Sequence, residues 1–116
     1  MDASKLIAKA LEQRESWVEL DGVRKVKVRR PPAAEMFAFG RATSPELFLR
    51  SVVGWEGFTE ADVLGSAVGS DSAVAFDVEL WHVLALDQIE WIGKVSEALV
   101  TAIKSYLDTQ DAARKN

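Results

Sequence analysis

An Asp-Gly pair at residues 21–22 constrains the fold of this chain more than any other local feature. It separates two runs rich in β-forming side chains, residues 17–20 and residues 23–28. Asp-Gly between such runs favours a two-residue type I′ turn, because both central residues of that turn need a positive φ angle. The sequence therefore predicts a β-hairpin over residues 16–30.

The two-residue loop also predicts a register, with Leu20 opposite Val23 and Trp17 opposite Val26. Both faces of the hairpin would then carry apolar side chains, and neither would be purely polar. The sets would be Trp17, Val26 and Val28 on one face, and Val18, Leu20 and Val23 on the other. Because an isolated hairpin is marginal in water, we expect this one to pack on helices or to extend another sheet.

Helical periodicity is found on both sides of the hairpin. Apolar residues at helical spacing predict an amphipathic helix over residues 3–14, capped by Asp2 or Ser4. After the hairpin, residues 33–41 are expected to be helical. Ser44 as N-cap, followed by Pro45, then predicts an apolar helix that runs through Val53 and is ended by Gly54.

The second half of the chain is expected to be helical as well. Thr59 begins a short helical turn, and Asp77 is a suitable N-cap for a short helix. Asp87, with Glu90 three residues later, predicts the N-terminus of the last and longest helix. The apolar stripe of that helix consists of Ile92, Val95, Leu99, Ala102, Ile103 and Tyr106.

These elements predict an α+β fold: a small, mainly helical single domain over residues 1–116 with one N-terminal β-hairpin. The expected parts are a helix at 3–14, the hairpin at 16–30, a helical part at 32–107 with a mobile loop at 65–73, and a frayed tail at 108–116. A length of 116 residues suits one domain, and 48% apolar residues are enough to form a core.

The residue types present argue against an enzyme. The chain has no cysteine and one histidine, His82. Disulfides, thiolate metal sites and cysteine nucleophiles are therefore excluded, and a lone histidine does not form a usual zinc site. The glycine clusters match no nucleotide-binding pattern. We expect no catalysis, no metal and no cofactor. With no apolar run long enough to span a membrane and no secretion signal, we expect a cytoplasmic protein.

Basic residues gather in the second strand of the expected hairpin, at Arg24, Lys25, Lys27, Arg29 and Arg30. They could contact phosphates, dock an acidic partner or form a solvated strand edge. The net charge of −4 and the lack of a recognition-helix or RNA-stacking motif make nucleic acid the less favoured partner. Residues 1–50 hold ten Lys/Arg and seven Asp/Glu, whereas residues 51–116 hold four and eleven. Such halves can attract each other within one fold or between subunits.

Apolar side chains supply a second set of candidate contacts. Each of the four tryptophans could anchor an interface or fill the core. Trp91, beside the stripe residue Val95, is the tryptophan we place most readily at an interface, and Trp55 with Phe58 forms a second candidate segment. The candidate partner-binding residues are therefore Trp55, Phe58, Trp91 and Val95, with Arg24, Lys25 and Lys27 from the basic strand.

Several of these segments also occur together in one known family. They are Val26-Lys27-Val28-Arg29-Arg30-Pro31 at the end of the hairpin, Val52-Val53-Gly54-Trp55-Glu56-Gly57-Phe58, and Ala75-Phe76-Asp77 with Leu80-Trp81. A terminal amphipathic helix follows them. In this order, over residues 20–107, the chain resembles the tail assembly chaperones of long-tailed bacteriophages.

The resemblance implies protein–protein binding without catalysis. In that family a small helical protein binds the aggregation-prone tape-measure protein in the host cytoplasm and keeps it soluble while tail-tube subunits polymerise around it. The implied partners are the tape-measure protein and the tail tube protein, and a homo-oligomer stays open. The family has no catalytic motif that would assign roles to individual residues.

Three alternatives stay open. The first is a phage or prophage structural protein, such as a minor tail or completion protein that remains in the virion. The second is a nucleic-acid adaptor that uses the basic strand at residues 24–30. The third is a small enzyme with His82 and carboxylates in a cleft.

Overall fold

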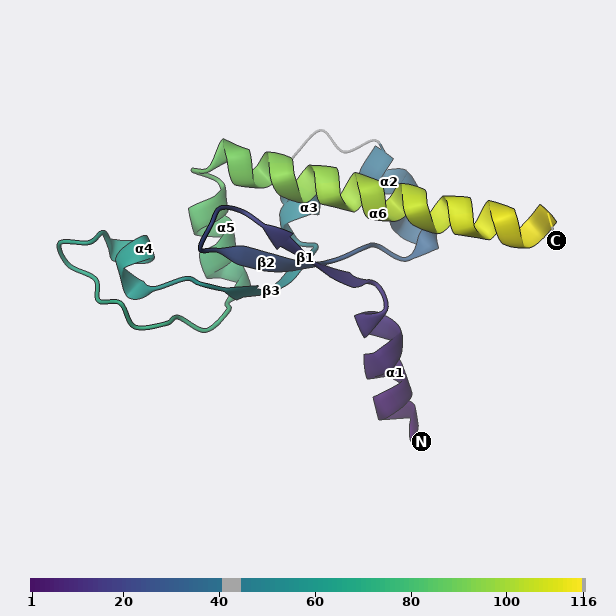
Figure 1. Ribbon diagram of the computed structural model, residues 1–116, viewed down its shortest axis with the longest axis horizontal. Coiled ribbons are helices and arrows are strands. Elements are labelled where there is room, and N and C mark those ends of the chain that lie inside the picture. The colour runs from purple at the N-terminus through teal and green to yellow at the C-terminus, as the bar shows by residue number, and fades with distance from the viewer. Residues whose placement is uncertain (41–44, 116) are drawn as a thin grey trace.

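Helices cover one face of a three-stranded antiparallel sheet in the computed structural model, which describes residues 1–40 and 45–115 (Figure 1). The strands are β1 (Glu15–Glu19), β2 (Lys25–Arg29) and β3 (Val52–Glu56), in the order β1-β2-β3. The helices are α1 (Ala3–Glu12), the 3₁₀ turn η1 (Ala33–Glu35), α2 (Met36–Gly40), α3 (Glu46–Leu49), α4 (Glu60–Leu64), α5 (Val78–Ala85) and α6 (Ile89–Lys115). The α+β class is confirmed, but the sheet includes a strand from outside the N-terminal hairpin.

The hairpin forms where it was expected, with a different turn. Leu20 N–H donates to the Arg24 carbonyl at 2.9 Å, and the Asp21 carboxylate accepts from the N–H groups of Val23 and Arg24 at 2.8 and 2.7 Å. Among the described residues, only Gly57 and Gly65 have a positive φ angle. The predicted type I′ turn is therefore wrong: the Asp21 side chain bonds to the backbone of a longer loop.

The longer loop moves the register by one residue, so the predicted pairs are wrong as well. Val18 lies opposite Val26, and Trp17 lies opposite Lys27. A shift of one residue exchanges the faces of a strand. The helix-covered face carries the buried side chains of Leu20, Val26 and Val28, while 43% of Trp17 is exposed on the open face.

The expected helix through Val53 ends early. α3 ends at Leu49, and residues 52–56 form β3, antiparallel to β2 with Val26 opposite Trp55. The register shifts between Lys27 and Val28, where the Arg29 N–H donates to the Ser51 carbonyl at 2.8 Å. A short apolar run does not distinguish strand from helix by periodicity, and here the free edge of β2 decides the outcome. The expected N-cap of the preceding helix, Ser44, lies outside the described residues.

After β3 the chain turns tightly at Gly57, whose φ angle is +88°. A Cβ atom at Gly57 would lie 2.1 Å from the Val23 carbonyl oxygen, so the turn packs directly on the hairpin loop. The expected helical turn follows as α4. The Thr59 side chain and the Asp62 carboxylate cap each other's backbone there. Residues 65–72 contain no helix or strand, and Ser70 and Ser72 accept backbone hydrogen bonds from residues 61 and 60 at 2.9 and 3.0 Å.

The last two helices complete the core. The Asp77 carboxylate caps α5 by accepting from Leu80 N–H at 2.9 Å, as expected. α6 begins at Ile89, after the predicted cap Asp87, and continues to Lys115, whereas a frayed tail was expected from residue 108. Val95 and Leu99 of its stripe are fully buried. The Trp81 side chain of α5 is also fully buried and donates its Nε1–H to the Leu49 carbonyl at 3.1 Å.

The first helix differs from the others because it contributes nothing to this core. α1 is capped by Asp2, whose carboxylate accepts from Lys5 N–H at 2.9 Å. It has no buried residue and extends away from the sheet (Figure 1). The amphipathic helix is therefore confirmed from Ala3 to Glu12, but its apolar face is open to solvent.

Candidate partner-binding site

The Trp55–Phe58 segment, a predicted contact for a partner, lies inside the fold. The two rings stack with centroids 4.1 Å apart, and only 8% of Trp55 and 1% of Phe58 is exposed. Trp55 Nε1–H donates to the Val74 carbonyl at 2.8 Å, which satisfies the polar atom of the ring. In this conformation both side chains contribute to the core.

The two candidates on α6 are also used within the molecule. Val95 is fully buried, and Trp91 is half-buried between other rings. Its centroid lies 5.7 Å from that of Phe58, edge to face, and 6.2 Å from that of Trp81. These four apolar candidates thus form one continuous aromatic and aliphatic core.

Arg24 ties the hairpin to the segment after β3. Its guanidinium pairs with Asp21 at 2.7 Å and with Asp62, and it lies 5.9 Å from the centroid of the Trp91 ring. The hydrogen bond from the Arg24 guanidinium is the largest cause of the lowered pKa of Asp62. Burial raises this pKa, and the hydrogen bonds from Thr59 lower it further. Burial by itself raises the pKa of Asp21, but bonds from the Arg24 and Val23 N–H groups outweigh that effect and lower it.

Lys25 and Lys27 lie on the open face of the sheet, on either side of Trp17. Their Nζ atoms are 4.6 and 5.1 Å from the centroid of its ring. Lys25 pairs with Glu56 at 3.4 Å, and Lys27 pairs with Glu15 at 4.0 Å. The basic strand therefore faces carboxylates of both neighbouring strands, and this balance weakens its attraction for phosphates.

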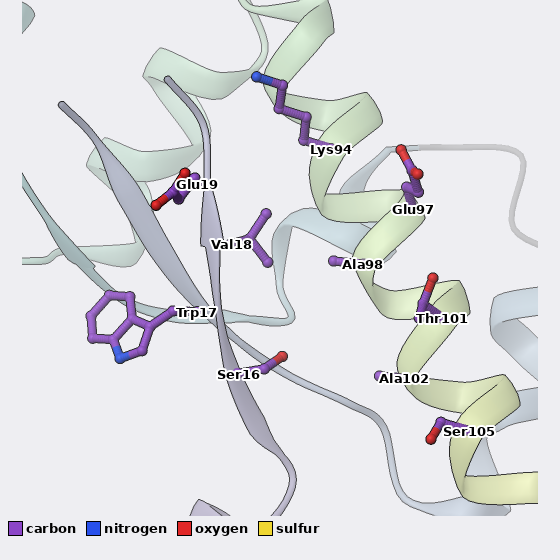
Figure 2. Close-up of a pocket in the computed structure, with 10 residues that line it drawn as sticks. All are labelled: Ser16, Trp17, Val18, Glu19, Lys94, Glu97, Ala98, Thr101, Ala102 and Ser105. Atoms are coloured by element: carbon purple, nitrogen blue, oxygen red, sulfur yellow. The ribbon is translucent and has the colours of Figure 1, made fainter. Parts of the chain in front are cut away.

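A first groove lies between β1 and α6 and has a volume of about 550 Å³; we name it the edge groove (Figure 2). Figure 2 shows Val18 pointing toward α6 and Trp17 pointing to the other side of the sheet. The α6 side presents mainly small or polar side chains, namely Lys94, Glu97, Ala98, Thr101, Ala102 and Ser105. Such a lining offers little apolar surface to a partner.

A second groove lies where α2 and α3 meet the second half of α6, with a volume of about 450 Å³; we name it the helical groove. Its apolar lining is Met36, Phe48, Val100, Ile103 and Leu107, and its polar lining is Lys104, Asp108 and Asp111. Val100 is 58% exposed and Leu107 48% exposed. The apolar stripe expected from the sequence included Ile103 but not Val100 or Leu107, although these three residues follow the i, i+3, i+7 spacing of a helix face.

No catalytic arrangement is apparent in the described part of the chain. His82 lies on α5, and its Nε2 atom is buried without a hydrogen-bond partner. Across residues 1–40 and 45–115, no three acidic or histidine side chains are grouped so that they could hold a metal ion. Over the same residues, every helix is too short or too polar to cross a lipid bilayer.

Comparisons of the chain with protein-family models, with curated proteins and with solved structures give no match. A function is therefore inferred from the geometry of the surfaces and from the residues that carry the resemblance. Of the surfaces described, the helical groove combines the most exposed aliphatic side chains with a charged rim. We take it as the candidate partner-binding site.

Proposed function

We propose that this protein is a phage tail assembly chaperone that keeps a tape-measure protein soluble in the host cytoplasm by protein–protein binding, without catalysis. The observation that carries the proposal is the helical groove, where Val100 and Leu107 of α6 remain about half exposed beside α2 and α3. A groove of this kind accepts the apolar face of an amphipathic helix. A tape-measure protein, as a long amphipathic helix, presents such a face repeatedly.

The rim of the helical groove adds directional contacts. Lys104, Asp108 and Asp111 line its polar side, so basic and acidic side chains of a bound helix both find partners. Rim charges of this type set orientation and association rate more than affinity. Reversible binding, which a chaperone requires, is consistent with a short apolar strip inside a polar rim.

The test is co-expression with the longest coiled-coil-like protein encoded just downstream, taken as the candidate tape-measure protein, and scored by the soluble fraction of that protein and by co-purification. We expect wild type to keep the tape-measure protein soluble. Val100→Asp places a charge in the helical groove and is expected to reduce co-purification at least tenfold. Val83→Asp is the matched control, because Val83 is also a helical valine, 65% exposed, and lies on α5 outside the groove.

Two results would contradict the proposal. In the first, the tape-measure protein stays insoluble with wild type and nothing co-purifies. In the second, Val83→Asp impairs binding as much as Val100→Asp does. Detection of the chain in purified virions would favour a minor tail or completion protein. Binding of nucleic acid that falls steeply with salt would favour an adaptor that uses the basic strand.

A further inference from the structure

The apolar face of α1 lacks a partner within the described part of the molecule. Leu6 is 54% exposed and Ile7 60% exposed, and the helix buries none of its residues. Isolated helices shorter than about 12–15 residues are marginal in water, and α1 has 10. A short amphipathic helix of this kind gains stability when another surface covers its apolar face.

The helical groove has the complementary properties. It presents the aliphatic side chains of Val100, Ile103 and Leu107 in a concave surface. Its rim holds Asp108 and Asp111 together with Lys104, whereas α1 carries Lys5 and Lys9 together with Glu12. If α1 enters this groove, apolar surface contacts apolar surface, and the excess of lysine on α1 lies near the excess of aspartate in the rim.

The position of α1 directs it to another molecule. In Figure 1, α1 projects below the sheet, whereas α2 and the second half of α6 lie above it. The start of β1 is fixed to the end of β2, because Arg30 N–H donates to the Arg14 carbonyl at 2.9 Å. We propose that α1 of one copy lies in the helical groove of a second copy.

The contact joins two different surfaces, so each copy offers one helix and one groove. A single short helix buries less than the roughly 1,200 Å² of a standard stable interface, so association is weak and depends on concentration. A helix of the bound tape-measure protein, the client, competes with α1 for the same groove. The inference uses this groove but does not depend on which client the protein binds.

The first experiment measures mass directly, by sedimentation equilibrium over a concentration series of the full chain. Wild type is expected to exceed its monomer mass of 12.8 kDa as concentration rises. The double variant L6E/I7E, altered only in α1, and Val100→Asp, altered only in the groove, are each expected to remain monomeric. Circular dichroism should show both variants folded, because these side chains are exposed.

Mixing the two variants gives the decisive result. L6E/I7E still has an intact groove and Val100→Asp still has an intact α1, so one complementary contact survives. We expect the equimolar mixture to form a dimer that does not grow further. A wild type that stays monomeric, a single variant that still associates, or a mixture that stays monomeric would each overturn the proposal.

A cross-linking experiment distinguishes contact between copies from contact within one copy. Because the chain has no cysteine, any disulfide formed by introduced residues reports their proximity. Ile7→Cys with Leu107→Cys is expected to give disulfide-linked dimers and longer chains of copies, whereas Ile7→Cys with Val83→Cys should give neither. A disulfide within a monomer would show that α1 folds onto its own groove and would overturn the proposal.

Client binding separates this inference from the proposed function. L6E/I7E removes the competing helix and leaves the groove intact, so it should co-purify the tape-measure protein at least as well as wild type. Loss of client binding in L6E/I7E would overturn the competition between α1 and the client. If neither form binds a client and the mixture still dimerises, the proposed function fails and self-association stands.

Discussion

At the scale of single residues, Arg24 and Gly57 fix the position of the segment after β3. Arg24 pairs with Asp62 from α4 and with Asp21 in the hairpin loop. Gly57 brings the backbone so close to Val23 that a Cβ atom would lie 2.1 Å from its carbonyl oxygen. The sequence marked Gly57 as part of a distinctive motif, but it did not reveal this contact, because Val23 lies in a distant part of the chain.

Gly57→Ala is expected to destabilise the protein by about 2–3 kcal/mol or more, since it combines a positive φ angle with a backbone clash. Gly22→Ala is the matched control. Its Cβ would have no neighbour within 4 Å and its φ angle is not positive, so its effect should be within about 0.5–1 kcal/mol. Urea denaturation measures both. Equal losses would contradict the close contact at Gly57.

The lowered pKa values of Asp62 and Asp21 make the free energy of unfolding depend on pH in acid solution. In the folded protein these carboxylates bind protons less readily than in the unfolded chain. Their stabilisation is therefore fully present above the ordinary aspartate pKa of 3.8 and is lost as the pH falls through the lower, folded values. We expect the free energy of unfolding to decrease below about pH 4.

Asp62→Asn isolates this contribution. Because the substitution removes a charged partner of Arg24, it should lower the free energy of unfolding by about 2 kcal/mol at neutral pH. It should also make the decrease of this free energy at acid pH smaller. Asp71→Asn, at an exposed position in the loop after α4, is the control and should follow wild type. Denaturation at a series of pH values measures all three proteins. Parallel curves for wild type and Asp62→Asn would contradict the role of this pair.

At the scale of elements, features that depend on residues close in the sequence were predicted better than features that depend on distant segments. The helix start at Thr59 and the cap at Asp77 were predicted correctly, because both depend on residues within three positions in the sequence. The strand at residues 52–56 was read as a helix end, because its identity depends on the free edge of β2. The register of the hairpin failed for a subtler reason: the Asp21 side chain bonds two backbone N–H groups and lengthens the loop.

Substitutions of Trp17, in β1, and of Leu20, directly after this strand, distinguish the two registers. In the observed register, Leu20 is 2% exposed and Trp17 is 43% exposed. Leu20→Ala is therefore expected to cost about 2–5 kcal/mol. Trp17→Ala should cost only about 1 kcal/mol, mainly through lost contacts with Lys25 and Lys27. Thermal or urea denaturation measures both, and a larger loss for Trp17→Ala would contradict the register.

At the scale of the whole molecule, the sequence predicted the class but not the shape. Opposite charges in the two halves meet within the fold at Arg24–Asp62 and Lys25–Glu56. The amphipathic pattern of α1 predicted a helix correctly, but such a stripe looks the same whether it faces its own core, another molecule or solvent. For the same reason the candidates Trp55, Phe58, Trp91 and Val95 lie in the core, while the helical groove was missed.

The projecting helices should be visible in solution. The Cα radius of gyration is 16.2 Å, whereas a compact chain of 116 residues has about 13 Å. We expect small-angle X-ray scattering at low concentration to give a radius of gyration of about 16 Å for the monomer. A value near 13 Å under those conditions would mean that α1 lies against the body.

The elongated outline also affects how the molecule diffuses. Its principal extents are 59 × 38 × 23 Å, so its friction in water exceeds that of a sphere of equal mass. On a gel-filtration column the monomer should therefore elute early, at a position that globular standards assign to a heavier protein. Elution volume alone would thus suggest a dimer even when the protein is a single copy. It would also shift little on dimerisation if the dimer were more nearly spherical than the monomer.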